Sequence, residues 1–216
     1  MAKSSYQVDW TVLLIGGSSG AGKTILAKQL GLRYGCSWLE VDDLRLALQR
    51  SQVVLPEHTE TLYFFEETPH IWEMPAERLR DGLIAVGHVM IPALEVVIEN
   101  HVDTVAPVVI EGDGILPSLF TRSSIRTRAA SGHVRAVFLV EPEEDAIFTN
   151  MMVRHRGIAE RTEADLRIEA RAKWLFGRWL ADEAQHYGLP LVEPRPWHTL
   201  SERVMEAVDA SSHLFG

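Results

Sequence analysis

Short apolar runs alternate with amphipathic stretches along this chain, which predicts a parallel sheet covered by helices. We expect strands near residues 11–15, 36–41, 107–110, 134–140 and 189–192. Helices are expected near residues 23–32, 44–50, 143–153, 162–186 and 201–211. Because strands and helices alternate, the pattern indicates an α/β fold whose sheet is covered on both faces.

The longest amphipathic pattern lies in the middle of the chain. Apolar residues recur there at steps of three and four, which places them on one face of a long helix. They are Leu83, Val86, Met90, Leu94 and Val97. Pro92 should kink this helix. The preceding residues 51–75 are irregular, so we expect a single domain over 1–216 with a helical insertion at about 51–104 that binds an acceptor.

The charge balance excludes some classes of partner. The 216 residues include 21 Lys and Arg and 30 Asp and Glu, so the formal net charge is −9. An acidic surface repels nucleic acid and anionic lipid, and we expect neither as a partner. The N-terminal residues lack the apolar core of a signal peptide, and the single Cys36 cannot form an internal disulfide. We expect a cytoplasmic protein, either a monomer or a homodimer.

One motif is specific by itself. Residues 17–24, GSSGAGKT, match G-x-x-x-x-G-K-[ST] between a predicted strand and a predicted helix. Such a loop points backbone N–H groups at a phosphate, and the following helix adds the positive end of its dipole. We predict ATP and Mg²⁺ as cofactors, with Lys23 as a catalytic charge on the phosphates and Thr24 as a metal ligand. The ATP-binding residues are Gly17, Ser18, Ser19, Gly20, Ala21, Gly22, Lys23 and Thr24.

Acidic residues follow two of the predicted strands. Asp42 and Asp43 stand where ligands bind in a doubly wound sheet, and a hydroxyl acceptor needs a carboxylate to take its proton. We predict Asp42 as the catalytic base and both residues as acceptor-binding; the alternative is that they cap the next helix. Glu111 takes the place of the usual metal-binding Asp, and Asp113 lies between glycines that allow a ligand to approach. The alternative for this pair is a turn with solvated acids.

Basic residues suggest how the phosphoryl group and the acceptor are held. Arg154 and Arg156, with Arg161 as an alternative, suit a mobile lid at about 153–163, because arginine keeps its charge and offers five fixed donors. By analogy with kinases of this shape, Arg195 follows the last strand beside the adenine.

Four further basic residues precede or form the predicted acceptor side. They are Arg45, Arg78, Arg80 and His88, and from them we expect a small anionic acceptor. The alternative is that they pair with acids such as Glu77 and Asp81 and face water.

Together these segments resemble the P-loop small-molecule kinases, in particular the 2-phosphoglycerate kinase-like group and its zeta-toxin and adenylylsulfate kinase relatives. The resemblance rests on GGSSGAGKT, VDDLR, VVIEGDGILP, AVFLVEP, RHRG and GLPLVEPR, which cover nearly the whole chain in order. It implies a three-layer P-loop fold, a five-stranded sheet ordered 2-3-1-4-5, and phosphorylation of a small molecule by ATP. It also implies Asp42 as base or acceptor ligand, and Arg154 or Arg156 in the lid. Asp113 departs from the group's pattern, which leaves the acceptor open.

Two other functions fit the same motifs. An ATP-binding switch or sensor would use the phosphate-binding loop without phosphorylating a metabolite, and the unusual Glu111 keeps this possibility open. A toxin-like kinase that acts on a nucleotide sugar would share the chemistry and differ only in its acceptor.

Overall fold

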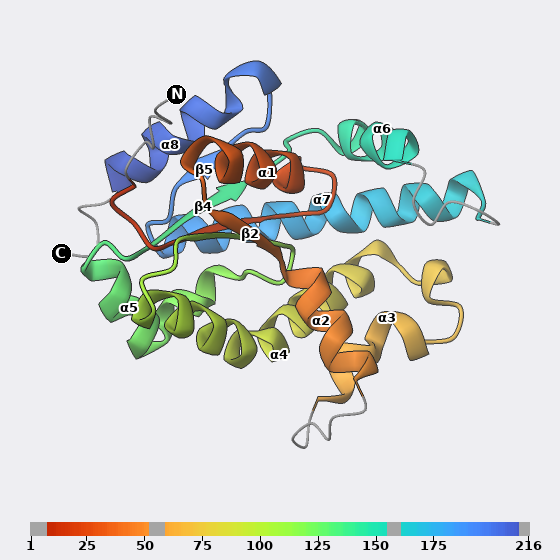
Figure 1. Cartoon of the computed structure of the whole chain (residues 1–216). Coiled ribbons are helices and arrows are strands. Elements are labelled where there is room, and N and C mark those ends of the chain that lie inside the picture. The colour runs from red at the N-terminus through yellow and green to blue at the C-terminus, as the bar shows by residue number, and fades with distance from the viewer. Residues whose placement is uncertain (1–7, 52–58, 155–160, 212–216) are drawn as a thin grey trace.

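The fold is built on one parallel sheet. Figure 1 shows a computed structural model of the chain, which describes residues 8–51, 59–154 and 161–211. Within these residues, five strands pair in parallel in the order β2-β3-β1-β4-β5. They are β1 (Val12–Gly17), β2 (Ser37–Glu40), β3 (Val108–Glu111), β4 (Val134–Leu139) and β5 (Leu191–Val192). The predicted fold class and strand order are confirmed.

Helices cover both faces of the sheet. The α-helices are α1 (Lys23–Tyr34), α2 (Val41–Arg50), α3 (Phe64–Glu67), α4 (Ala76–Asp103), α5 (Ser123–Ala130), α6 (Glu144–Arg154), α7 (Glu163–His186) and α8 (Leu200–Ala210). Short 3₁₀ helices occur at η1 (Glu60–Tyr63), η2 (Ile71–Glu73), η3 (Pro117–Thr121) and η4 (Trp197–Thr199). Helix α5 was not predicted, because only Ile125 and Ala129 of its eight residues are buried apolar side chains.

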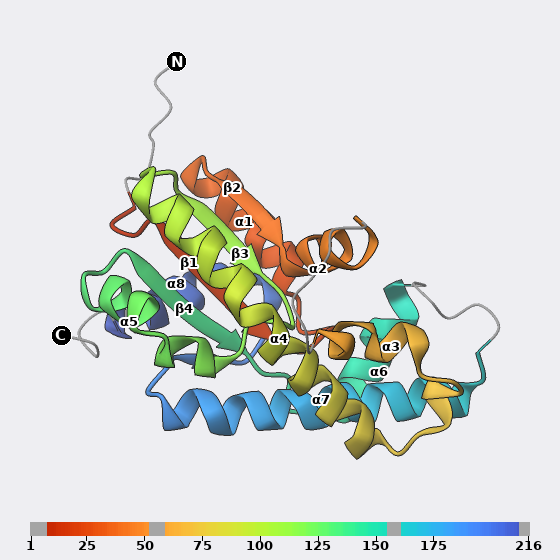
Figure 2. The same cartoon turned by 90° about the horizontal axis from the view of Figure 1, so that it is seen from below.

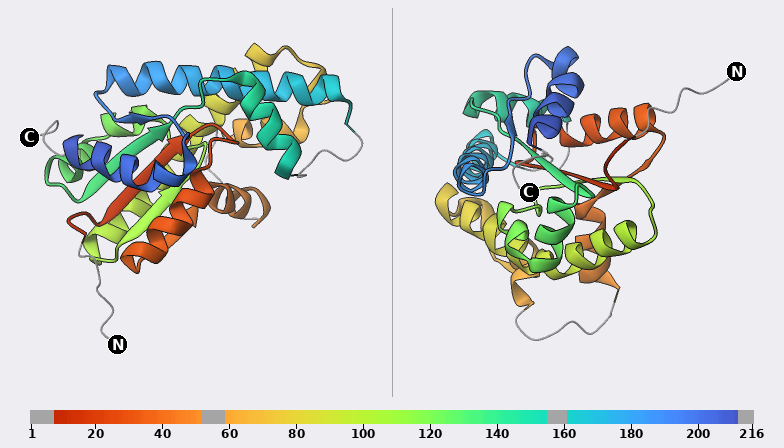
Figure 3. Two further views of the ribbon diagram at one scale, coloured as in Figure 1. Left: turned by 90° about the horizontal axis from the view of Figure 1, so that it is seen from above. Right: turned by 90° about the vertical axis from the view of Figure 1, so that its left-hand side faces the viewer.

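Alternating residues of the central strand belong to two different cores. Val12 and Leu14 of β1 pack with α4, α5 and α7, whereas Leu13 and Ile15 pack with α1 and α8. Figure 1 shows α1 and α8 above the sheet and α4 and α5 below it. Figure 2, seen from below, looks onto α4 and α5, and the left view of Figure 3, seen from above, looks onto α1 and α8. This arrangement explains why β1 is buried along its whole length.

Helix α4 runs through Pro92 as one continuous helix of 28 residues. It is long enough to cross a membrane, and an 18-residue stretch of it has a mean hydropathy of 1.7, so it would also fit a membrane span by length and composition alone. In the fold, however, nine of its residues are buried, and Met90, Leu94 and Ile98 belong to the core beneath the sheet. We attribute the apolar character of α4 to this packing.

The boundary between the second strand and the helix after it differs from the prediction, and this difference affects the site. The second strand was expected to reach Val41, but β2 ends at Glu40 and α2 begins at Val41. Asp42 and Asp43 therefore lie in the first turn of a helix, and neither side chain caps it. The predicted N-cap of the helix over residues 162–186 is confirmed, because Thr162 and Asp165 form a capping box at the start of α7.

Candidate active site

The loop between β1 and α1 has a backbone that only glycine adopts without strain. Gly17, Gly20 and Gly22 have φ angles of 138°, 93° and 88°. Gly22 also has no room for a side chain, because a Cβ there would lie 2.3 Å from the ring of Trp197. The Nδ2 atom of Asn150 on α6 donates to the carbonyl oxygen of Gly20 at 3.0 Å. Asn150 and Trp197 thus contact the loop from other parts of the chain, and α1 begins directly after it.

Lys23 is buried at the base of this loop and has two partners. Its Nζ atom lies 3.0 Å from the carbonyl oxygen of Ser18 and 2.5 Å from Oδ1 of Asp113. Asp113 stands just beyond β3 and is about one-quarter exposed (26%). A phosphate that enters the loop therefore competes with Asp113 for the ammonium group of Lys23 and leaves that carboxylate free for another proton donor.

The two predicted metal ligands, Thr24 and Glu111, are in contact with each other. The Thr24 hydroxyl donates to Oε1 of Glu111 at 2.6 Å. Burial raises the pKa of Glu111, although Lys23 and the bond from Thr24 lower it. In the part of the chain that the structure describes, no group of three His, Cys, Asp or Glu side chains could hold a metal alone. Thr24 and Glu111 fit Mg²⁺ instead as a pair that shares the ion with phosphate oxygens, the usual arrangement for this ion.

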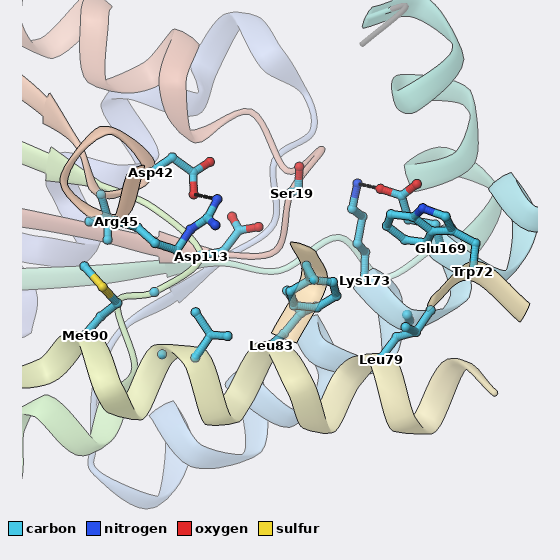
Figure 4. Close-up of a pocket in the computed structure, with 16 residues that line it drawn as sticks. Ser19, Asp42, Arg45, Trp72, Leu79, Leu83, Met90, Asp113, Glu169 and Lys173 are labelled. Atoms are coloured by element: carbon cyan, nitrogen blue, oxygen red, sulfur yellow. Dashed lines mark hydrogen bonds and ion pairs between the residues drawn. The ribbon is translucent and has the colours of Figure 1, made fainter. Parts of the chain in front are cut away.

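Two cavities meet beside the loop. The phosphate cavity, of about 320 Å³, is lined by Lys23, Thr24 and Glu111 among others. The second cavity, of about 220 Å³, lies between α2, α4 and α7, and we call it the acceptor cavity. Five residues line both cavities, and we call this ring of residues the junction (Figure 4). They are Ser19, Asp42, Asp113, Glu169 and Lys173.

The predicted acceptor residues fall into two groups. Asp42 and Arg45 line the acceptor cavity, and Oδ1 of Asp42 lies 3.4 Å from Nη2 of Arg45. Asp43 is exposed and lines neither the phosphate cavity nor the acceptor cavity.

Arg78, Arg80 and His88 lie on other faces of α4. Arg78 lines a separate cavity beside α3, Arg80 pairs with Asp81 at 2.7 Å, and His88 is exposed. The expectation that these residues reach the acceptor is not met, because successive helical residues point about 100° apart. The face that does reach the cavity carries Leu79, Leu83, Val86 and Met90.

Of the predicted lid and adenine residues, the structure describes the side chains of only Arg161 and Arg195. The side chain of Arg154 and the whole of Arg156 lie outside the described residues. Arg161 is described: its guanidinium stacks on the Trp72 ring at 3.8 Å and also donates to Glu169. Arg195 does not line the phosphate cavity or the acceptor cavity; its Nη2 lies 2.5 Å from the buried Glu141.

Glu169 and Lys173 on α7 belong to the junction and were not predicted. Their side chains are 2.5 Å apart, and Glu169 also accepts from Arg161. Burial acts to raise the pKa of Glu169, but Lys173 and Arg161 together bring that pKa below its ordinary value. In the sequence the two residues are spaced i and i+4, which is the ordinary pattern of a surface ion pair. No local signal distinguished them from such a pair.

The aromatic part of the irregular segment also contributes to the acceptor cavity. Phe65 of α3 and Trp72 of η2 line it, while Tyr63 and Phe64 line the separate cavity beside α3. The sequence predicted that the insertion at about 51–104 binds the acceptor, without indicating which of its aromatic residues would do so.

No protein-family model matches the chain, and no curated protein matches it in sequence. Similar solved structures include shikimate kinase from Acinetobacter baumannii in complex with shikimate, at 12% identity and a TM-score of 0.51, covering 94% of this chain and 95% of that chain. Shikimate kinase from Bacteroides thetaiotaomicron is similar at 15% identity and a TM-score of 0.50, covering 92% and 98%. At these identities the likeness shows the shared three-layer fold alone. It does not place the chain in the 2-phosphoglycerate kinase-like group.

Proposed function

We propose that this protein is an ATP-dependent kinase that phosphorylates a hydroxyl group of a small molecule. The observation that carries the proposal is the junction, where a phosphate cavity and a second cavity share five lining residues, among them the carboxylates Asp42 and Asp113. Phosphoryl transfer needs a nucleotide and an acceptor in line, with their reacting atoms in contact. A protein that only binds ATP has no need for the second cavity.

Each step of the transfer has a candidate group. The loop N–H groups and Lys23 hold the β- and γ-phosphates. Thr24 and Glu111, which share a hydrogen bond, would hold Mg²⁺, and the ion would offset negative charge on those phosphates. The acceptor oxygen forms a bond to the γ-phosphorus while the bond from that phosphorus to the β,γ-bridging oxygen breaks. The acceptor proton passes to a carboxylate at the junction, either Asp42 or Asp113. ADP and the phosphorylated acceptor are the products.

Asp42 is the stronger candidate for the base. Its side chain is 66% exposed, and its partner Arg45 is 3.4 Å away, so it can turn toward a bound hydroxyl. Asp113 is held by Lys23 at 2.5 Å and becomes available only when a phosphate takes that ammonium. Both carboxylates line the junction, and substituting them separately tests the assignment.

Several finer expectations from the sequence stay proposals. The lid role of Arg154 and Arg156 and the adenine contact of Arg195 still rest on the resemblance and on fold analogy, as does the 2-phosphoglycerate kinase-like grouping. A cytoplasmic monomer or homodimer and a nucleotide sugar as acceptor are also proposals. The anionic acceptor has less support than before, since only Arg45 of its four basic residues lines the acceptor cavity.

The test is ATP turnover with and without a metabolite extract, followed by ³¹P NMR. The kinase proposal expects ADP formation that depends on the extract, and a new phosphomonoester signal. A Lys23→Met variant serves as the control for contaminating kinases. ADP formation at the same rate without extract, or none at all alongside tight ATP binding, would favour the switch or sensor instead.

A further inference from the structure

Apolar side chains make up half of the lining of the acceptor cavity. Eight of its sixteen lining residues carry apolar side chains, and these come from α2, α3, η2, α4 and α7. Leu79, Leu83 and Met90 project from one face of α4 into the cavity, and Trp72 lies at one side of it, next to Glu169 (Figure 4). Leu79 and Met90 are almost fully buried in the absence of a ligand. Such a surface favours an apolar body in the ligand.

The charged groups of the cavity are concentrated at the junction, apart from Arg45 beside Asp42. The lining includes three acids, Asp42, Asp113 and Glu169. It includes two cations, Arg45 and Lys173. Acids therefore outnumber cations, although the cavity was expected to attract an anion.

Both cations already have acidic partners. Arg45 lies 3.4 Å from Asp42, and Lys173 lies 2.5 Å from Glu169. The third acid, Asp113, is paired with Lys23 from the phosphate side. In the described part of the chain, therefore, every cation that lines the acceptor cavity is matched by a carboxylate. An anionic acceptor would have to break one of these pairs or lie beside a carboxylate, and both cost free energy.

We propose that the acceptor is an uncharged, amphipathic alcohol: a hydroxyl group on an aromatic or branched aliphatic body. The hydroxyl lies at the junction within reach of Asp42 and Asp113, and the body lies on the apolar face of α4 beneath Trp72. This inference rests on the proposed kinase function, and it differs from the anionic metabolite that the sequence suggested. The reaction is the one described above, with the alcohol oxygen attacking the γ-phosphorus and its proton passing to the carboxylate.

Four probe compounds separate the charge of the acceptor from the polarity of its body. 3-Methylbenzyl alcohol and 3-(hydroxymethyl)benzoate share a ring and a hydroxyl and differ in charge. Glycerol and D-glycerate form the corresponding pair without an apolar body. Binding of each is measured by titration calorimetry to the full-length protein with Mg²⁺ and a non-hydrolysable ATP analogue, and phosphorylation is measured separately with ATP by ³¹P NMR.

The neutral aromatic alcohol should bind best. We expect its Kd to be about tenfold or more below those of the other three compounds. Glycerol and D-glycerate lack the apolar body, in which each buried methylene contributes about fourfold, and the two anions would lie beside carboxylates or break an ion pair. Equal or tighter binding of either anion would overturn the inference, and its phosphorylation would leave the kinase function standing. No binding by any of the four would also overturn it. Binding of 3-methylbenzyl alcohol with no ADP formation would support the predicted ligand chemistry of the cavity and count against the kinase function.

A matched pair of variants locates the binding site. Leu83 is half-buried and lines the cavity, whereas Leu48 on α2 is half-buried, packs on the same core and does not line it. Leu83→Gln should raise the Kd of 3-methylbenzyl alcohol about tenfold and leave the Kd of the ATP analogue unchanged. Leu48→Gln should change neither Kd by more than about twofold. Phe65→Ala, outside α4, provides a second test, and unchanged alcohol binding in both cavity variants would overturn the proposal.

Discussion

Lys23 and Asp113 form an ion pair at 2.5 Å before any phosphate is bound. Lys23→Met removes the charge that faces the phosphates, and we expect kcat to fall by about 10²-fold or more. The fold should persist, because Asp113 is partly exposed and can be hydrated. Steady-state ATP turnover and a thermal melt check both expectations. Lys28→Met, which changes an exposed lysine on the same helix, is the control. Normal ATP turnover by Lys23→Met would contradict the role of this loop in binding the ATP phosphates.

Asp42 and Asp43 are neighbours with different positions, which makes them a natural comparison. Asp42 lines both cavities and Asp43 lines neither. Asp42→Asn should lower kcat by about 10²-fold or more while the Kd for ATP stays the same, as for a lost general base. Asp43→Asn should keep the normal rate. If both variants turn over ATP at the normal rate, Asp113 becomes the candidate base. The kcat of Asp113→Asn then tests that assignment.

Glu111 combines a costly burial with a proposed role in holding Mg²⁺. Because burial raises its pKa above the ordinary value, its charged form is less favourable in the folded protein than in the unfolded chain. Glu111→Gln should therefore raise the melting temperature of the nucleotide-free protein at pH 7, by about 2–4 °C for each kcal/mol. The same variant should lose most of its Mg²⁺-dependent turnover. A lower melting temperature would show that the charge of Glu111 stabilises the fold.

At the scale of elements, α7 is joined to η2 through Glu169. This carboxylate bonds to Arg161 and Lys173, and Arg161 stacks on Trp72 of η2. Glu169→Gln should lower the free energy of unfolding at pH 7 by about 1–3 kcal/mol, the scale of hydrogen bonds to charged groups. Glu163→Gln, which changes an exposed residue on the same helix, should alter the free energy of unfolding by no more than about 0.5 kcal/mol.

The effect of Glu169 should also depend on pH. Its pKa in the folded protein is lowered from an ordinary value of 4.5, so the unfolded chain binds more protons as the pH falls through this range. The stabilisation is thus complete above about pH 4.5 and is lost at lower pH. Urea denaturation of the protein and of Glu169→Gln between pH 3 and 7 measures this, and a constant difference across the range would contradict it.

At the scale of the molecule, the loop, the two cavities and three helices meet around one ligand path, so nucleotide binding should stabilise the whole fold. A non-hydrolysable ATP analogue with Mg²⁺ at 100 times its Kd should add about 2.7 kcal/mol by mass action. This corresponds to a rise of roughly 5–10 °C in the melting temperature for a chain of this size. Differential scanning calorimetry measures it, and an unchanged melting temperature would contradict nucleotide binding.

The sequence by itself determined the features that depend on neighbouring residues. Residues 17–24 carry their own backbone requirement, because a loop with φ angles above +80° at Gly20 and Gly22 needs glycine there wherever the loop occurs. The buried run of β1 and the cap at Thr162 are local in the same way. These signals sufficed for the α/β alternation, for the phosphate-binding loop and for most of the helix boundaries.

Only the tertiary structure decided which residues face the acceptor. In the sequence, Leu83 and Leu94 belong to one apolar stripe, yet Leu83 lines a cavity and Leu94 is fully buried in the core beneath the sheet. Glu169 and Lys173 resemble a surface pair until α7 is placed beside α2 and α4. Periodicity fixes which side chains share a face of a helix, but what covers that face depends on segments far away in the chain. The charge and polarity of the acceptor cavity are therefore a property of the packing.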